Sequence, residues 1–283
     1  MKIGLISDIH GNPIALDAAL GDIKAQGGVD QYWILGDLVA AGFDPIGVFQ
    51  RIDQLPNVIC TVGNNDLYLT KGISYGFPDP KPTTEREWLH QVGLSRNMGF
   101  TYGQVWAVGK QQFIANLPLE QRITLPDGTR VLGVHASPGQ HSGKGFRPDQ
   151  SEAIMLDRMS TAHADLVIVG HTHWPMNRMI GDVHLVNLGS ISNQYGPDLC
   201  AKYAILEADE YGYTITHRYV AYDRAACVAY CEQNNFPGSD FVGRYCRGEY
   251  VARWIRGRSS AELLSLLPTP NKPYTRASVI ASV

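Results

Sequence analysis

The sequence lacks a long apolar segment and a strong excess of one charge. No stretch reaches the ~20 apolar residues that a membrane-spanning helix requires. The N-terminal run meets Asp8 before it is long enough for a secretory signal, so we expect neither export nor a membrane anchor. With 24 basic and 27 acidic residues, the net charge is −3. This balance gives the chain no overall attraction for nucleic acid or for acidic lipid.

Cysteine is also scarce. The five cysteines are odd in number and scattered, which favours a reduced, cytoplasmic protein over a disulfide framework; they are Cys60, Cys200, Cys227, Cys231 and Cys246. Cys227 and Cys231 are spaced to share a helix face, but no second close pair completes a zinc set.

Alternating short apolar runs and amphipathic segments characterise the first part of the chain. Apolar runs at 2–7, 32–35 and 58–62 predict buried strands. Asn12 and Pro13 are typical of a helix start, and a second helix is expected over 44–54. Strands that alternate with helices indicate an α/β fold that begins with a largely parallel sheet.

The second half continues this pattern and then changes it. Strands are expected at 130–136 and 165–170, with a helix near 149–161 between them. The next four predicted strands follow one another without helices, at 176–180, 183–189, 202–208 and 213–220. Consecutive strands of this kind pair antiparallel, so we expect a second sheet. A helix near 223–234 follows.

The segment 71–121 interrupts the strand pattern. It begins with the proline-rich loop GFPDPKPTT at 76–84 and continues with two predicted helices, 84–96 and 102–116. We interpret 71–121 as an inserted helical cap on a single domain that spans 1–260. Residues 261–283 are expected to form a C-terminal tail that is extended or loosely ordered from 268 onward.

Residue types that bind metals stand at five predicted strand ends. The segments are LISDIH, WILGDL, CTVGNND, LGVHAS and VIVGHTH, and their candidate ligands are Asp8, His10, Asp37, Asn64, His135, His171 and His173. Each residue alone has a simpler explanation as a turn residue or a hydrogen-bonded structural histidine. Sites of open α/β sheets lie beyond the carboxyl ends of the strands, so we expect these side chains to converge.

The ordered set of motifs resembles that of the calcineurin-like metallophosphoesterases, in particular their small bacterial and archaeal phosphodiesterases. The matching pieces are D-x-H at 8–10, G-D at 36–37, G-N-x-D at 63–66, His135 and G-H-x-H at 170–173. The resemblance implies a four-layer αββα sandwich of two mixed sheets, with two divalent metal ions at its edge.

The resemblance also implies how the ligands are shared. Three residues would hold the first ion (Asp8, His10 and His173) and three the second (Asn64, His135 and His171), with Asp37 bridging both. The mixed nitrogen and oxygen donors suit Mn, Fe, Zn, Co or Ni better than Mg or Ca. Two such ions generate and share a hydroxide, and the few ligand charges leave a positive site for a phosphate. Asp37, Asn64 and His135 would then act in catalysis as well as in metal binding.

The sequence departs from the family pattern at Asn65. Many phosphatases of this superfamily have a histidine here that acts as general acid or phosphate contact, and an amide cannot supply that proton. His141 is our first candidate for a replacement acid, because its loop follows the strand of His135. His90 in the cap is the alternative. Lys144 and Arg147 are either phosphate contacts or solvated loop charges.

The sequence therefore predicts a dinuclear, metal-dependent phosphoesterase for small phosphodiesters, with phosphomonoesters as a second substrate class. One alternative is a non-catalytic metal-binding scaffold of the same fold, but all seven ligand positions are filled. Another is a nuclease, favoured by the basic run Arg244, Arg247, Arg253, Arg256 and Arg258, which Asp240 and Glu249 interrupt. We expect no nucleic-acid or membrane partner, and the sequence leaves a homo-oligomer open.

Overall fold

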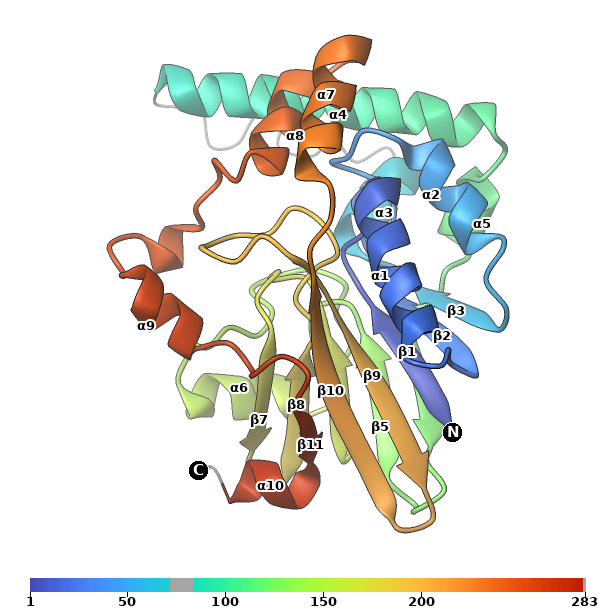
Figure 1. The fold of residues 1–283 in the computed structure, drawn as a ribbon, viewed down its shortest axis with the longest axis vertical. Helices are drawn as coiled ribbons and strands as arrows, with labels where there is room; N and C mark the ends of the chain where they lie inside the picture. The colour runs from blue at the N-terminus through green and yellow to red at the C-terminus, as the bar shows by residue number, and fades with distance from the viewer. Residues whose placement is uncertain (72–83, 282–283) are drawn as a thin grey trace.

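Two β-sheets form the centre of the molecule. The computed structural model describes residues 1–71 and 84–281 (Figure 1). The first sheet has the strand order β11-β10-β9-β1-β2-β3. Its parallel part consists of β1 (Lys2–Ile6), β2 (Gln31–Leu35) and β3 (Val58–Thr61). The long strands β9 (Ala201–Asp209) and β10 (Gly212–Val220) extend it antiparallel to β1.

The second sheet is also mixed, with the order β4-β5-β6-β8-β7. Parallel strands β5 (Arg130–Val134), β6 (Leu166–Val169) and β8 (Val183–Asn187) form its middle. Antiparallel edge strands β4 (Glu120–Thr124) and β7 (Met176–Ile180) flank them. The inner faces of the two sheets pack together through residues such as Leu5, Trp33 and Ile168.

Helices cover both outer faces, which completes the predicted αββα sandwich. Helices α1 (Pro13–Ala25) and α2 (Pro45–Ile52) pack on the first sheet, and α6 (Glu152–Met159) packs on the second. Helix α1 starts as expected, because Asn12 caps it by accepting a hydrogen bond from the backbone N–H of Ala15. The short helix α3 (Asn64–Lys71) follows β3 directly. The predicted mixed α/β fold with two sheets is confirmed.

The helical insertion differs from its predicted form. One continuous helix, α4 (Glu85–Ala107), replaces the two helices expected at 84–96 and 102–116, and only the short α5 (Gln111–Ala115) follows. The break expected between residues 96 and 102 is absent because tertiary contacts stabilise the helix there. Asn97 is buried, and its side-chain amide donates a hydrogen bond to the carbonyl of Gly42 at 2.7 Å. The proline-rich loop lies outside the described residues up to position 83.

The C-terminal part also differs from the loosely ordered tail that we expected. Helix α7 (Arg224–Asn234) forms near the predicted 223–234 and packs against α8 (Ser239–Cys246), which in turn contacts α4. A 3-10 turn η1 (Arg253–Ile255) and α9 (Ser260–Ser265) follow (Figure 1). Strand β11 (Pro273–Thr275) then pairs antiparallel with β10, and α10 (Arg276–Ile280) contacts β7. Without β11, this part of β10 would be an unpaired sheet edge; β11 satisfies the backbone hydrogen-bonding groups along it.

Candidate metal centre

The loops after five parallel strands bring the predicted ligands to one edge of the sandwich. The loops after β1 and β2 are joined by backbone hydrogen bonds, including those from His10 to Asp37 and from Asp8 to Gly36. Two groups of side chains have ligand atoms that all lie within 4.8 Å of one another: Asp8, His10 and His173, and Asp8, Asp37 and His135. Five of the seven predicted ligands therefore lie together, in two adjoining groups.

Asp8 belongs to both groups, and its carboxylate is held in one orientation. Its Oδ2 accepts hydrogen bonds from the hydroxyl of Ser7 at 2.6 Å and from the backbone N–H of His171 at 2.9 Å. Its Oδ1 is fully buried without a hydrogen-bond partner and lies 3.2 Å from Nε2 of His173. A buried carboxylate oxygen left unpaired is costly. A cation at this position would satisfy it, so the residues present fit a metal ion.

Three histidines are oriented in the same way. In each, Nδ1 hydrogen-bonds to a backbone carbonyl oxygen. The distances are 2.8 Å from His10 to Ala40, 2.7 Å from His135 to Leu35 and 2.7 Å from His173 to Asn193. A hydrogen bond of this kind keeps the proton on Nδ1 and directs Nε2 toward the ion, as second-shell carbonyls do in metal sites. The Nε2 atoms of His10 and His173 lie 3.1 Å apart, a separation that suits two ligands of one ion.

The segment after β3 places Asn64 beside His135, and the next residue, Asn65, binds the carboxylate of Asp37. Asn64 Oδ1 lies 3.2 Å from His135 Nε2. Asn65 donates its backbone N–H to Asp37 Oδ1 at 2.8 Å and its amide to Oδ2 at 2.6 Å. Asp37 Oδ2 lies 3.4 Å from His135 Nε2 and 3.8 Å from His10 Nε2. Asp37 thus lies between a histidine of each predicted set, and Asn65 orients it.

His171 lies next to the two groups but is oriented differently. Its Nε2 lies 2.8 Å from the carbonyl of Gly143, so Nδ1 is the nitrogen left for a metal. Its ring approaches that of His135 with centroids 5.1 Å apart.

Three further residues, for which no role was predicted, support the ligands. Buried Asp66 accepts backbone hydrogen bonds from Asp37, Leu38 and Gly63, which fixes the loop after β2. Asn187, at the end of β8, donates to the carbonyl of Gly170 and to Thr172 Oγ1. Ser7 orients Asp8. Ser7 and Asp66 lie within strand-end segments, and Asp66 is also the last residue of the G-N-x-D motif, whereas Asn187 lies in the strand predicted at 183–189; these positions were the only signals for them.

The backbone at the ligands is unusual. Five of the seven predicted ligands have φ between 49° and 67°: Asp8, His10, Asp37, His171 and His173. Residues of this kind cost of order 1–3 kcal/mol each in the left-handed region, although Asp and His tolerate it better than most. The loops therefore store strain in order to turn the side chains toward a common point.

Charges within the centre compensate one another. Burial opposes the charged form of His135, but Asp37 and Asp8 raise the pKa of His135 to about 10. Burial opposes ionisation of Asp37 as well, but His135 and His10 lower the pKa of Asp37. Burial, together with the charge of Asp37, raises the pKa of Asp66 to about 6. In the metal-free centre, protonated imidazole therefore supplies the positive charge that balances the carboxylates.

This balance predicts that metal binding releases protons. A pKa of about 10 leaves His135 protonated at pH 7, and Nε2 must lose its proton to become a ligand. Metal affinity should therefore rise with pH below 10, by about tenfold per pH unit for each proton displaced. Titration of Mn²⁺ by calorimetry at pH 7, in two buffers of different ionisation enthalpy, measures this release. Heats that do not depend on the buffer would contradict the prediction.

A cavity of about 260 Å³ opens at the metal centre. Its floor consists of His10, Asp37, Asn64, His171 and His173. Its walls come from Asn65, Ala41, Asn193 and Tyr195, from His90 and Leu94 of α4, and from Phe241 and Tyr245 of α8. Helix α4, within the predicted cap, thus contributes directly to the walls.

The other predicted contacts lie outside this cavity. His141 is not among the described residues that line it, although Gly143 of the same loop contacts His171. Lys144 and Arg147 do not line it either, and Arg147 pairs with Asp149 at 2.9 Å.

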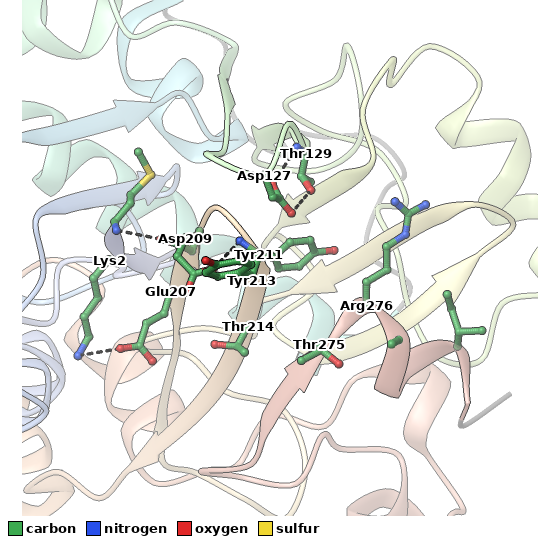
Figure 2. Close-up of a pocket in the computed structure, with 15 residues that line it drawn as sticks. Lys2, Asp127, Thr129, Glu207, Asp209, Tyr211, Tyr213, Thr214, Thr275 and Arg276 are labelled. Carbon is green, nitrogen blue, oxygen red and sulfur yellow. Dashed lines mark hydrogen bonds and ion pairs between the residues drawn. The ribbon is translucent and has the colours of Figure 1, made fainter.

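A larger cavity of about 980 Å³ lies at the opposite end of the strands (Figure 2). It includes Lys2 at the start of β1, Glu207 and Asp209 at the end of β9, and Arg276 of α10. Lys2 lies 3.3 Å from Glu207, so part of its charge is balanced within the cavity. None of the predicted metal ligands lines this cavity.

The fold and the centre together define a metal-binding α/β sandwich protein. A family model described as "Calcineurin-like phosphoesterase superfamily domain" matches residues 1–211. The chain belongs to the calcineurin-like phosphoesterase superfamily, as its motifs predicted.

Comparisons with individual proteins support this membership. MJ0912, an uncharacterized protein of Methanocaldococcus jannaschii, is 27% identical over 254 residues, which cover 83% of this chain and 93% of that protein. The crystal structure of a metallophosphoesterase from Sphaerobacter thermophilus matches with a TM-score of 0.68 and 25% identity, covering 88% of this chain and 99% of that one. A bis(5'-nucleosyl)-tetraphosphatase of Erwinia tasmaniensis is 40% identical over only 70 residues, 24% of this chain and 26% of that protein.

Among the helices that the structure describes, none combines the length and the apolar character that a bilayer crossing requires.

Proposed function

We propose that the protein is a dinuclear, divalent-metal-dependent hydrolase of small phosphodiesters, with phosphomonoesters as a second substrate class, and that it acts in the cytoplasm. The observation that carries the proposal is the shared carboxylate of Asp8. Its unpaired, buried Oδ1 lies among Nε2 atoms that backbone carbonyls have already oriented. Five cysteines without disulfide partners fit a reducing compartment.

In this proposal Asp8, His10 and His173 would hold one ion, and Asn64, His135 and His171 would hold the other. Asp37 lies between the sets and would bridge them. Bound Mn, Fe, Zn, Co or Ni would supply Lewis-acid chemistry toward a phosphoryl group and water. Asp37 and Asn64 line the cavity in which the phosphate would react, and buried His135 would act as a metal ligand next to them. Asn65 keeps Asp37 in place.

The leaving-group proton has two candidate donors. His141, chosen from the sequence, lies in the loop that contacts His171. His90 is favoured by its position, since it lines the cavity beside Asn65. General acid catalysis typically contributes about 10²–10⁴-fold, and mostly to esters of weakly acidic alcohols.

The alternatives make different demands on the structure. A non-catalytic metal-binding scaffold of the same fold would keep the same ligands and the same strained backbones, so turnover is what distinguishes it. A nuclease would need free cations, whereas Arg244 and Arg247 both pair with Glu249. A bis(5'-nucleosyl)-tetraphosphatase activity, suggested by the partial relatives, is a second candidate substrate class.

The deciding experiment is a hydrolysis panel of aryl and alkyl phosphodiesters, phosphomonoesters and a dinucleoside tetraphosphate, each with Mn, Fe, Zn, Co, Ni or Mg. We expect diester turnover that depends on a transition metal. His90→Ala or His141→Ala should selectively slow the alkyl esters, by about 10²-fold or more, and so identify the acid. Absence of turnover in every metal and substrate combination would overturn the proposed function.

A further inference from the structure

The walls of the 260 Å³ cavity are unlike its floor. Four rings, which we call the aromatic wall, line it together with the metal ligands: His90, Tyr195, Phe241 and Tyr245. Among the described residues that line the cavity, none is a lysine or an arginine. Apart from the metal centre, the described lining therefore offers aromatic rings, two of which carry phenol hydroxyls, together with amide groups and two aliphatic side chains.

The rings are in contact with one another and with the centre. Tyr195 stacks on the ligand His173, with centroids 5.1 Å apart and planes at 27°. Tyr245 meets Tyr195 at 6.2 Å and Phe241 at 5.4 Å, and Phe241 in turn meets His90 at 5.3 Å. A continuous aromatic surface thus leads from the metal ligand to α4.

The wall is held rigidly because α4 and α8 are in close contact. A Cβ on Gly93 of α4 would lie 2.8 Å from Cβ of Phe241, so the helices approach as closely as a glycine allows. Tyr250 supports Tyr245 from behind, with ring centroids 4.0 Å apart. Burial raises the pKa of the Tyr195 phenol, so it remains uncharged at neutral pH. A surface of this kind is ready to stack with a ring without rearrangement.

We propose that the aromatic wall is the subsite for the alcohol part of the substrate and selects esters that carry one uncharged aromatic ring system and a single phosphate. The position of the phosphate rests on the proposed function. The volume lies below the roughly 300–1,000 Å³ of pockets for drug-sized ligands, so the second group is small. Additional phosphates would need cations that the described lining does not offer, which disfavours polyphosphate esters.

Binding of two matched phosphonates to the Mn-loaded protein tests the subsite without turnover. Benzylphosphonate and cyclohexylmethylphosphonate have the same connectivity, but only the first has a flat π-system. We expect calorimetry to show benzylphosphonate binding three- to tenfold more tightly, the range typical of an added aromatic contact. Tyr245→Leu should reduce the difference to less than about twofold, whereas Tyr245→Phe should retain it.

Tyr102→Leu is the matched control, since Tyr102 is an exposed tyrosine of α4 that does not line the cavity. It should leave both dissociation constants unchanged. Equal affinity of the two phosphonates for the wild-type protein, or a preference that survives Tyr245→Leu, would overturn the subsite. So would faster turnover of a dinucleoside tetraphosphate than of benzyl phosphate. If the protein hydrolysed no ester but still preferred benzylphosphonate, and Tyr245→Leu abolished that preference, the result would support the subsite and refute the proposed function.

Discussion

Asp37→Asn is expected to lose one or both metal ions and to lower turnover by about 1,000-fold or more. Both carboxylate oxygens of Asp37 accept hydrogen bonds from Asn65, at 2.8 and 2.6 Å. An amide has a single acceptor oxygen, so one of these donors would face an NH₂ group. The substitution also removes the negative charge beside His135 and His10.

Elemental analysis after gel filtration, together with a diesterase assay, measures both effects. Asp53→Asn is the control, because Asp53 is an exposed aspartate that pairs with Lys110, and neither residue lines the cavity. It should retain full metal content and full activity. An Asp37 variant that still carries two ions per chain would refute the bridging assignment.

Gly170→Ala is expected to damage the centre without removing any ligand. A Cβ at Gly170 would lie 1.9 Å from Ser7 Oγ and 2.4 Å from Asp8 Oδ2, so the carboxylate must move. Overpacking of this kind typically lowers the free energy of unfolding by about 1–3 kcal/mol. Loss of the oriented carboxylate should weaken metal binding by about 10–100-fold, as the loss of second-shell contacts does elsewhere.

Gly21→Ala provides a matched comparison, because Gly21 lies within α1 and its new Cβ would have no atom within 4 Å. It should raise the free energy of unfolding by about 0.5–1 kcal/mol through helix propensity alone and leave metal affinity unchanged. Thermal unfolding and Mn²⁺ titration of the two variants distinguish the effects. Wild-type metal affinity in Gly170→Ala would mean that the contact between Ser7 and Asp8 does not position the ligand.

The prediction of the metal centre depended on signals that are local in sequence. Apolar runs that end in Asp, Asn or His mark both a strand and the position of its carboxyl end. Parallel strands bring those ends to the same edge, so Asp8, Asp37 and His135 were expected to meet before any contact was known. Strands β1, β2, β3, β5 and β6 lie where these runs predicted them.

Such local signals could not predict how the side chains are oriented within the metal centre. Which nitrogen of each histidine faces inward depends on carbonyls that lie 20 to 100 residues away, such as Leu35 for His135 and Asn193 for His173. From the sequence, Asn65 was interpreted only as an amide in the place of a proton-donating histidine. In the structure it also donates hydrogen bonds to Asp37 and holds it in place.

The sequence by itself thus determined the two-sheet class, the order of the strands that carry ligands and the chemical types of those ligands, because strand patterning and strand-end residues are local properties. Only the tertiary structure decided that α4 is continuous, that β11 completes the edge of β10, and that rings of α8 connect His90 of α4 to Tyr195 beside His173. Each of these depends on contacts between segments far apart in the chain. Asn97 stabilises the middle of α4 through Gly42, 55 residues away, and no local propensity contains that information.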